Sequence, residues 1–355
     1  MTRMIPSAAR KHLAAAFLLT LFFACLAVAG TPRVWAAKGK LQIYFIDVEG
    51  GQSTLFVTPS GQSLLIDTGW ANHAGRDADR IVAAAKHAGL GKIDYVLLTH
   101  YHGDHTGGVP QLAARIPVGT FIDHGPLGET SPGTTKIWQA YQDVLATGKY
   151  KHIVPHPGDV LPISGMKATV VSGDGQLIDR SLPGGGQKNE YCNVQDTWPQ
   201  DTSENSRSLG LLIDFGKFKL LDMGDLTWDK DKQLMCPVNK LGSVDILVLP
   251  NHGMVPSSSH ALVDGLHSRV VLMNNGAAKG GTIPALDMVR QAPGLETLWQ
   301  LHYADKSGEH NTAAEYIANL QGADGGNYIQ VTAKRNGSFS VLNSRTTAVK
   351  NYPAK

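Results

Sequence analysis

The chain has 355 residues, of which 42% are hydrophobic and 17% are charged, and its formal net charge is +2. This composition is typical of a globular protein with enough apolar residues for a sizeable core. It excludes the disordered and fibrous classes of protein.

The first 36 residues are typical of a secretory signal peptide. The basic residues at its start are Arg3, Arg10 and Lys11. An apolar run over residues 13–28 follows them, and small residues suited to cleavage lie at 27–29 and at 34–36. We therefore expect an exported protein, periplasmic or secreted, whose mature part carries no membrane segment.

Processing changes the expected charge of the protein. Cleavage after Ala36 removes four basic residues and no acidic one, so the net charge falls from +2 to −2. A mature chain with this charge is not expected to bind nucleic acid strongly. The alternatives are a retained membrane anchor and lipid attachment at Cys25.

The mature part opens with a predicted β-meander and continues with alternating helices and strands. Three short β-rich runs, separated by tight turns, lie at residues 41–46, 53–57 and 63–66. The helical and strand-like runs after them lie at residues 77–88, 93–98, 109–116 and 118–122. The strand at 93–98 would place His100 at its carboxyl end, where sites in layered α/β folds usually form.

The second half repeats this pattern after a less regular middle. A helix is predicted at 137–145, and residues 181–204, rich in Gly, Pro, Asn and Ser, predict a long surface loop. Strands are predicted at residues 209–215, 218–223, 244–249, 270–273, 328–332 and 338–342. No break in composition divides this part, so residues 37–355 are expected to form a single domain.

Removal of the signal peptide leaves two cysteines, Cys192 and Cys236. An oxidising compartment favours one disulfide between them. Two separate buried thiols are the alternative, because sequence does not show whether the two residues meet.

The strongest chemical signal follows the strand at 93–98. His100, His102, Asp104 and His105 lie within six positions, between an apolar strand and Gly107-Gly108. Imidazole and carboxylate groups suit zinc, and also manganese or iron. A turn directs such side chains from two sides, so this segment predicts a site for one or two metal ions.

This His-x-His-x-Asp-His pattern resembles the signature of the metallo-β-lactamase superfamily. The resemblance implies an αββα sandwich, in which two mixed β-sheets are flanked by helices, with a metal site along one edge. Three further residues resemble family motifs, namely Asp67 in the first motif, Asp225 as a carboxylate shared by two metals, and His252 as the last histidine ligand.

Within the superfamily, the chain is most similar to the exported hydrolase domain of ComEC-type competence proteins. Asn205 and Ser208 resemble the Asn-x-x-Ser element of that group, and His252 lies in a stretch similar to its His-His-Gly motif. Two positions depart from the pattern, because Asn251 replaces the first histidine of the pair and Gln52 stands where that group often has Asp.

The resemblance implies a ligand set for two ions, expected to be zinc. One ion would be held by His100 and His102, the second by Asp104, His105 and His252, and Asp225 would be shared. Asp67 would orient a ligand histidine. Many relatives have a further histidine where this chain has Asn205, so the first ion would lack a ligand unless His124 supplied it.

The expected reaction is hydrolysis by a metal-bound hydroxide, with Asp104 also guiding a proton. The ComEC-type resemblance favours a phosphoester, phosphodiester or related small substrate. The alternatives are lactamase- or lactonase-type hydrolysis of a cyclic amide or ester, oxidoreductase use of a di-iron site, and a non-catalytic metal-binding module. The sequence does not indicate an oligomeric state.

Overall fold

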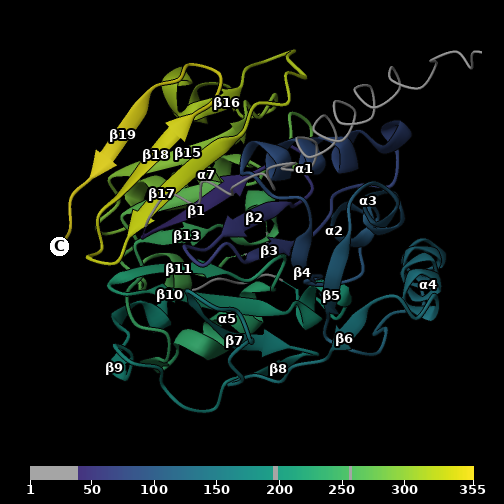
Figure 1. Ribbon diagram of the computed structural model, residues 1–355. Helices are drawn as coiled ribbons and strands as arrows, with labels where there is room; N and C mark the ends of the chain where they lie inside the picture. Colours follow the sequence, from purple (N-terminus) through teal and green to yellow (C-terminus); the bar gives the residue numbers. More distant parts are fainter. Residues whose placement is uncertain (1–38, 195–198, 256–257) are drawn as a thin grey trace, which may run out of the picture. The chain divides into compact units, whose positions relative to one another are not determined.

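The computed structural model describes residues 39–194, 199–255 and 258–355, and these lie in one compact unit (Figure 1). The predicted signal peptide lies outside the described residues. No helix within the described ranges is long and apolar enough to cross a membrane.

The first large sheet contains nine strands. In spatial order they are β19 (Val349–Tyr352), β18 (Phe339–Asn343), β17 (Ile329–Lys334), β1 (Lys40–Phe45), β2 (Thr54–Val57), β3 (Ser63–Ile66), β4 (Ile93–Leu97), β5 (Val118–Ile122) and β6 (Lys151–Ile153). The predicted meander is present, because β1, β2 and β3 pair antiparallel. From β3 to β6 the strands run parallel.

The second large sheet contains eight strands. Their spatial order is β16 (Ile317–Asn319), β15 (Thr297–His302), β14 (Val270–Met273), β13 (Ile246–Val248), β11 (Phe218–Asp222), β10 (Gly210–Phe215), β7 (Lys167–Gly173) and β8 (Gln176–Leu177). The hairpin of β10 and β11 was predicted, and from β11 to β16 the strands run parallel.

The remaining elements are helices and one small two-stranded sheet. The helices are α1 (Arg76–His87), α2 (Gly103–Thr106), α3 (Val109–Arg115), α4 (Pro132–Ala146), α5 (Trp228–Met235), α6 (His260–Val263) and α7 (Ile283–Gln291). The 3-10 turns are η1 (His73–Gly75), η2 (Glu190–Asn193), η3 (Glu204–Arg207), η4 (Pro250–Gly253), η5 (Gly308–His310) and η6 (Ala314–Tyr316). The small sheet pairs β9 (Gln187–Lys188) with β12 (Val238–Asn239).

Side-chain alternation along the strands builds the layers of the fold. Along β1, Ile43 and Phe45 belong to a core cluster that joins the two large sheets, whereas Tyr44 points to the opposite face. Helices α1, α3 and α4 cover that outer face of the first sheet. Helices α5, α6 and α7 cover the outer face of the second sheet. The architecture is therefore the αββα sandwich that the sequence predicted.

The middle of the chain is more regular than predicted. Strand β7 lies inside the second sheet beside β10, in a region for which no strand was predicted. Its Ala-Thr-Val-Val run contains β-branched residues that pack well on a pleated surface. The predicted loop over residues 181–204 contains β9 and η2 among its described residues, because β9 finds a partner in β12, about 50 positions later.

The predicted disulfide is present. Cys192 in η2 and Cys236, the residue after α5, are bonded, with their Cα atoms 5.6 Å apart. The bond therefore ties the segment of residues 187–193 to the helical layer of the second sheet.

Candidate metal centre

The candidate metal-binding residues lie at the carboxyl ends of strands in both large sheets. Residues 100–105 follow β4, Asp225 lies in the turn after β11, and His252 lies in η4 after β13. Parallel strands present these ends along one edge. Residues more than 120 positions apart in the sequence consequently meet there.

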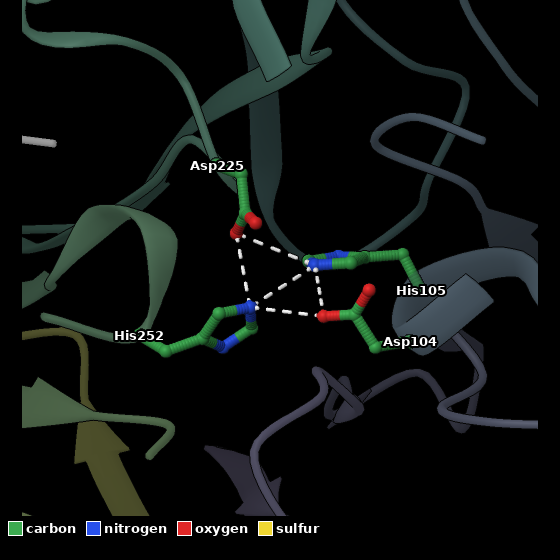
Figure 2. Close-up of side chains that lie close together, drawn as sticks. All are labelled: Asp104, His105, Asp225 and His252. Atoms are coloured by element: carbon green, nitrogen blue, oxygen red, sulfur yellow. Dashed lines mark hydrogen bonds and ion pairs between the residues drawn. The ribbon is translucent and has the colours of Figure 1, made fainter. Parts of the chain in front are cut away.

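Four buried side chains converge at this edge, and we call them the four-residue cluster: Asp104, His105, Asp225 and His252 (Figure 2). Nε2 of His105 lies 3.2 Å from Nε2 of His252. Oδ2 of Asp104 lies 3.3 Å from the first of these nitrogens and 3.2 Å from the second. Oδ1 of Asp225 lies 3.3 Å from each of them.

These separations match the chemistry of a tetrahedral metal site. Four ligand atoms arranged tetrahedrally about 2.0–2.1 Å from a zinc ion lie roughly 3.3–3.4 Å from one another. Oδ1 of Asp225 is buried and makes no hydrogen bond with any described residue. A buried carboxylate oxygen without a hydrogen bond is costly unless a cation binds it. The four residues therefore fit a metal ion.

The outer nitrogens of the two histidines are already occupied. Nδ1 of His252 donates to the carbonyl oxygen of Asn274 at 3.0 Å. Nδ1 of His105 lies 2.7 Å from Oδ2 of Asp67. Because a carbonyl oxygen or a carboxylate accepts a hydrogen bond, each ring carries a proton on Nδ1, and in its neutral form it directs the Nε2 lone pair into the cluster.

Asp67 thus has the position that an orienting role requires. It is fully buried, and its Oδ1 accepts a hydrogen bond from the backbone nitrogen of Thr99 at 2.8 Å. Its Oδ2 also accepts one from the hydroxyl of Thr99 at 2.8 Å, so the carboxylate is fixed against the loop that follows β4. Its orienting role stays a prediction.

The electrostatics of the cluster also favour a cation. Burial opposes charge on all four groups, but the neighbouring carboxylates raise the pKa of His105 and of His252. Against the same burial, His105 and His252 hold the pKa of Asp104 and that of Asp225 well below the usual range. Two ionised carboxylates buried together need a positive charge between them.

His100 and His102 form a neighbouring pair. Nε2 of His100 lies 3.0 Å from Nδ1 of His102 and 3.9 Å from Oδ2 of Asp225. Burial, with the positive charge of His105, holds the pKa of His100 well below its usual range, so this ring is neutral and able to ligate. The predicted first metal position therefore has two imidazoles and one shared carboxylate beside it.

The residues proposed to complete that position are engaged elsewhere or are weak ligands. Nε2 of His124 lies 2.9 Å from Oε2 of Glu204, and His124 is not part of the four-residue cluster. Oδ1 of Asn205 is buried and has no hydrogen-bond partner among the described residues. Ser208 places its hydroxyl 3.4 Å from Nδ1 of His100, on the side away from His102.

Sequence reasoning missed two linked acidic residues, of which Glu129 lies beside His102. Oε2 of Glu129 lies 3.4 Å from Nε2 of His102 and accepts a hydrogen bond from the backbone of the buried Glu204. Although burial opposes ionisation, hydrogen bonds from Thr134, the Glu204 backbone and Ser131 lower the pKa of Glu129 to about 2. Neither glutamate lies at a recognisable spacing from the histidine motif, so no sequence signal marked them.

Close backbone packing shapes the loops that carry the ligands. A Cβ atom on Gly51 would lie 2.4 Å from the carbonyl oxygen of Asp104, so only glycine fits there. In η4, Asn251 and His252 both have left-handed backbone angles, with φ of 49° and 57°. Asn tolerates this conformation better than most residues, which accounts physically for Asn251 in this position.

A second group of ligand-type residues lies outside the site, at Asp47, Glu49 and His302. Nε2 of His302 lies 2.6 Å from Oδ1 of Asp47, whose other oxygen accepts a hydrogen bond from Arg80 at 2.9 Å. His310, after the strand that ends at His302, pairs with Asp287.

Comparison with known proteins adds a family to this geometry. The family model described as the metallo-beta-lactamase superfamily matches residues 47–182. This range includes Asp67 and the histidine motif, whereas Asp225 and His252 lie beyond it.

Two curated relatives resemble parts of the chain. A hydroxyacylglutathione hydrolase from Stenotrophomonas maltophilia is 35% identical over 104 residues, which are 29% of this chain and 37% of the relative. An atrochrysone carboxyl ACP thioesterase from Cryptosporiopsis is 38% identical over 116 residues, which are 31% of this chain and 33% of the relative. The similarity thus spans about a third of the length of these relatives.

Among solved structures, the metallo-beta-lactamase fold protein YhfI from Bacillus subtilis is 13% identical, with a TM-score of 0.46. That alignment covers 74% of this chain and 96% of YhfI. The family match over residues 47–182 and the two-sheet sandwich agree with each other. Residues 47–182 of the chain are therefore similar to the metallo-β-lactamase superfamily.

Proposed function

We propose that this protein is an exported metal-dependent hydrolase. The observation that carries the proposal is the four-residue cluster, in which two imidazole nitrogens and two carboxylate oxygens are spaced as zinc ligands are. A bound metal ion supplies a water nucleophile at neutral pH and polarises the scissile carbonyl or phosphoryl oxygen. His100 and His102, with Asp225, would hold a second ion.

The protein's own residues would orient these groups and handle the proton. Asp67 and the carbonyl of Asn274 hold His105 and His252 in the ligating tautomer. The neighbours of Asp104 hold its pKa low despite burial, so this carboxylate stays ionised. It could accept a proton through the oxygen that does not bind the metal ion. Glu129 would orient His102 in the same way that Asp67 orients His105.

Two substrate classes follow from different observations. The Asn205 to Ser208 element and the Asn251-His252-Gly253 stretch resemble the ComEC-type domain, which favours a phosphoester or phosphodiester. The curated relatives are named as a hydroxyacylglutathione hydrolase and a thioesterase, which makes a thioester the second candidate. A small substrate is common to both, and strong nucleic-acid binding is not expected.

Export is supported by the signal-like first 36 residues and by the disulfide between Cys192 and Cys236. Sequencing the amino terminus of protein recovered outside the cytoplasm tests it. We expect a start at or near Ala37, and exported material that begins at Met1 would contradict processing.

The decisive experiment combines metal analysis with a substrate panel. Purified protein should contain zinc, manganese or iron by mass spectrometry, and chelation should abolish hydrolysis. The panel compares bis-p-nitrophenyl phosphate, an acylglutathione thioester, a chromogenic cephalosporin and an acyl lactone. A well-folded protein that binds no metal at any pH would exclude the proposal, and metal binding without hydrolysis would favour a non-catalytic module.

A further inference from the structure

Lys279 lies at the edge of the metal centre, in a glycine-rich loop after β14. Backbone contacts fix this loop against the ligand-bearing turn, because the nitrogen of Gly281 donates to the carbonyl oxygen of His252 at 2.9 Å. A Cβ atom on Gly280 would lie 2.2 Å from that same oxygen, so the approach requires glycine. The position of Lys279 relative to His252 is therefore set by the backbone.

The side chain of Lys279 lies between a candidate metal ligand and an aromatic ring. Its ammonium contacts Oδ2 of Asp104, the same oxygen that belongs to the four-residue cluster. It also lies 5.3 Å from the ring centroid of Trp70, within the range of a cation–π interaction. With 29% of its side chain exposed, Lys279 is open to a ligand from solvent.

Metal binding would weaken the ion pair between Lys279 and Asp104. Asp104 would share its negative charge with a divalent ion, so the ammonium would no longer be the main cation beside that carboxylate. The loop fixes the backbone of Lys279, and the ring of Trp70 offers the ammonium a second contact beside the centre. A partly exposed positive charge next to the reacting centre is suited to an anionic group of a bound molecule.

We propose that Lys279 and Trp70 form a subsite for a negatively charged group of the substrate, carried beside the bond that is hydrolysed. The inference rests on the proposed function and names a substrate property: the molecule bears a carboxylate or a phosphate close to its scissile bond. Lys279 is thus a specificity-determining residue, and its role differs from that of the metal ligands.

The first test measures discrimination between two esters that differ in one charge. 4-Nitrophenyl butyrate is neutral, whereas 4-nitrophenyl hydrogen glutarate carries a carboxylate. For Lys279→Met we expect the ratio of kcat/KM, charged over neutral, to fall at least tenfold from the wild-type ratio. Lys279→Arg should keep the ratio within about threefold, since it retains the charge. The matched control is Lys92→Met, because Lys92 is exposed near the start of β4, at the opposite end of the strand.

The second test does not depend on turnover. Calorimetry with zinc-loaded protein should show glutarate and inorganic phosphate binding at least tenfold more weakly to Lys279→Met than to the wild type or Lys279→Arg. A loss for glutarate alone would assign a carboxylate, and a loss for phosphate alone would assign a phosphate group. Equal binding to all three proteins at equal zinc content would overturn the subsite.

The two proposals fail in distinguishable ways. If the wild type binds zinc but hydrolyses neither ester nor any member of the substrate panel, the proposed hydrolase function fails, and anion binding still decides the subsite. If both esters are hydrolysed with an unchanged ratio in Lys279→Met, the hydrolase function stands and the subsite is refuted.

Discussion

Two clusters of histidine and carboxylate side chains lie at strand ends in this protein. They differ in whether the nitrogen and oxygen atoms that face the centre of the cluster are already engaged in hydrogen bonds. In the four-residue cluster, Nδ1 of His105 and Nδ1 of His252 form hydrogen bonds with groups outside the cluster. The Nε2 atoms of both rings face Oδ1 of Asp225, which has no hydrogen bond to a described residue. In the group of Asp47, Glu49 and His302, the imidazole nitrogen bonds Asp47 directly.

The difference separates a candidate metal centre from a structural ion pair. Arg80 already neutralises Asp47, so a divalent ion at that group would compete with a guanidinium and with an imidazole. In the four-residue cluster, Lys279 contacts Asp104, but Oδ1 of Asp225 makes no hydrogen bond with any described residue. The same residue types therefore suit a metal ion or form a structural ion pair, depending on whether ligand atoms are left without a hydrogen bond.

The largest effect is expected from His252→Ala. Loss of one of four ligands should remove the metal ion from the four-residue cluster and lower kcat/KM at least ~100-fold. Zinc content and circular dichroism measure the two consequences separately. The control is His310→Ala, which lies outside the cluster and pairs with Asp287. Full activity of His252→Ala at full zinc content would show that His252 is not a ligand.

The opposite pattern is expected for His302→Ala. The substitution removes a buried partner of Asp47, so the free energy of unfolding should fall by about 1–3 kcal/mol. Zinc content should stay at the wild-type value, because no metal is expected at this group. Urea denaturation and metal analysis check both statements. Loss of a zinc equivalent would mean that the second cluster also binds metal.

Within the metal centre, the two positions should differ in affinity. Four candidate ligands surround one position, whereas His100 and His102 with Asp225 would give the other only three. Zinc titration of the metal-free protein should show a tight step and a weaker one, and Asn205→His should tighten the weaker step about tenfold.

His124→Ala is the matched variant for this titration. It should leave the weaker step unchanged, because the ring is bonded to Glu204. Two equally tight steps in the wild type, with one weakened by His124→Ala, would identify His124 as the missing ligand.

The smallest effect concerns Asp222, next to the metal centre. Burial raises its pKa to about 6, against the hydrogen bonds from Gln52 and Gly224. The folded state therefore holds this proton above the pH at which the unfolded chain releases it. The contribution of Asp222 to stability consequently falls as pH rises from about 4 to about 6.

Asp222→Asn removes this dependence, because an amide does not ionise. Relative to the wild type, the variant should gain about 1 kcal/mol in free energy of unfolding between pH 5 and pH 7.5, with metal chelated in both proteins. Asp143→Asn, on the exposed side of α4, serves as the control. If the free energies of unfolding of the variant and the wild type differ by the same amount at pH 5 and at pH 7.5, the raised pKa of Asp222 is refuted.

Local patterns in the sequence predicted much of the fold. A β-rich run bounded by a glycine turn identified β1, and apolar runs followed by polar residues located β4 and β13. Strand β7 and the pairing of β9 with β12 were missed, because short strands depend on partners far away in the chain. The family resemblance assigned His102 and His105 to different metal ions, and the four-residue cluster contains His105 and not His102.

The sequence by itself indicated the kind of chemistry, since three imidazoles and a carboxylate within six positions after a buried strand favour metal binding. Only the tertiary structure decided which of these groups share a centre, because that depends on two sheets bringing β4, β11 and β13 to one edge. The tertiary structure also decided that Lys279 contacts Asp104, 175 positions away in the sequence, and that Nε2 of His302 forms a hydrogen bond with Asp47. A ligand needs a free lone pair at a common point, and that is a property of three-dimensional packing.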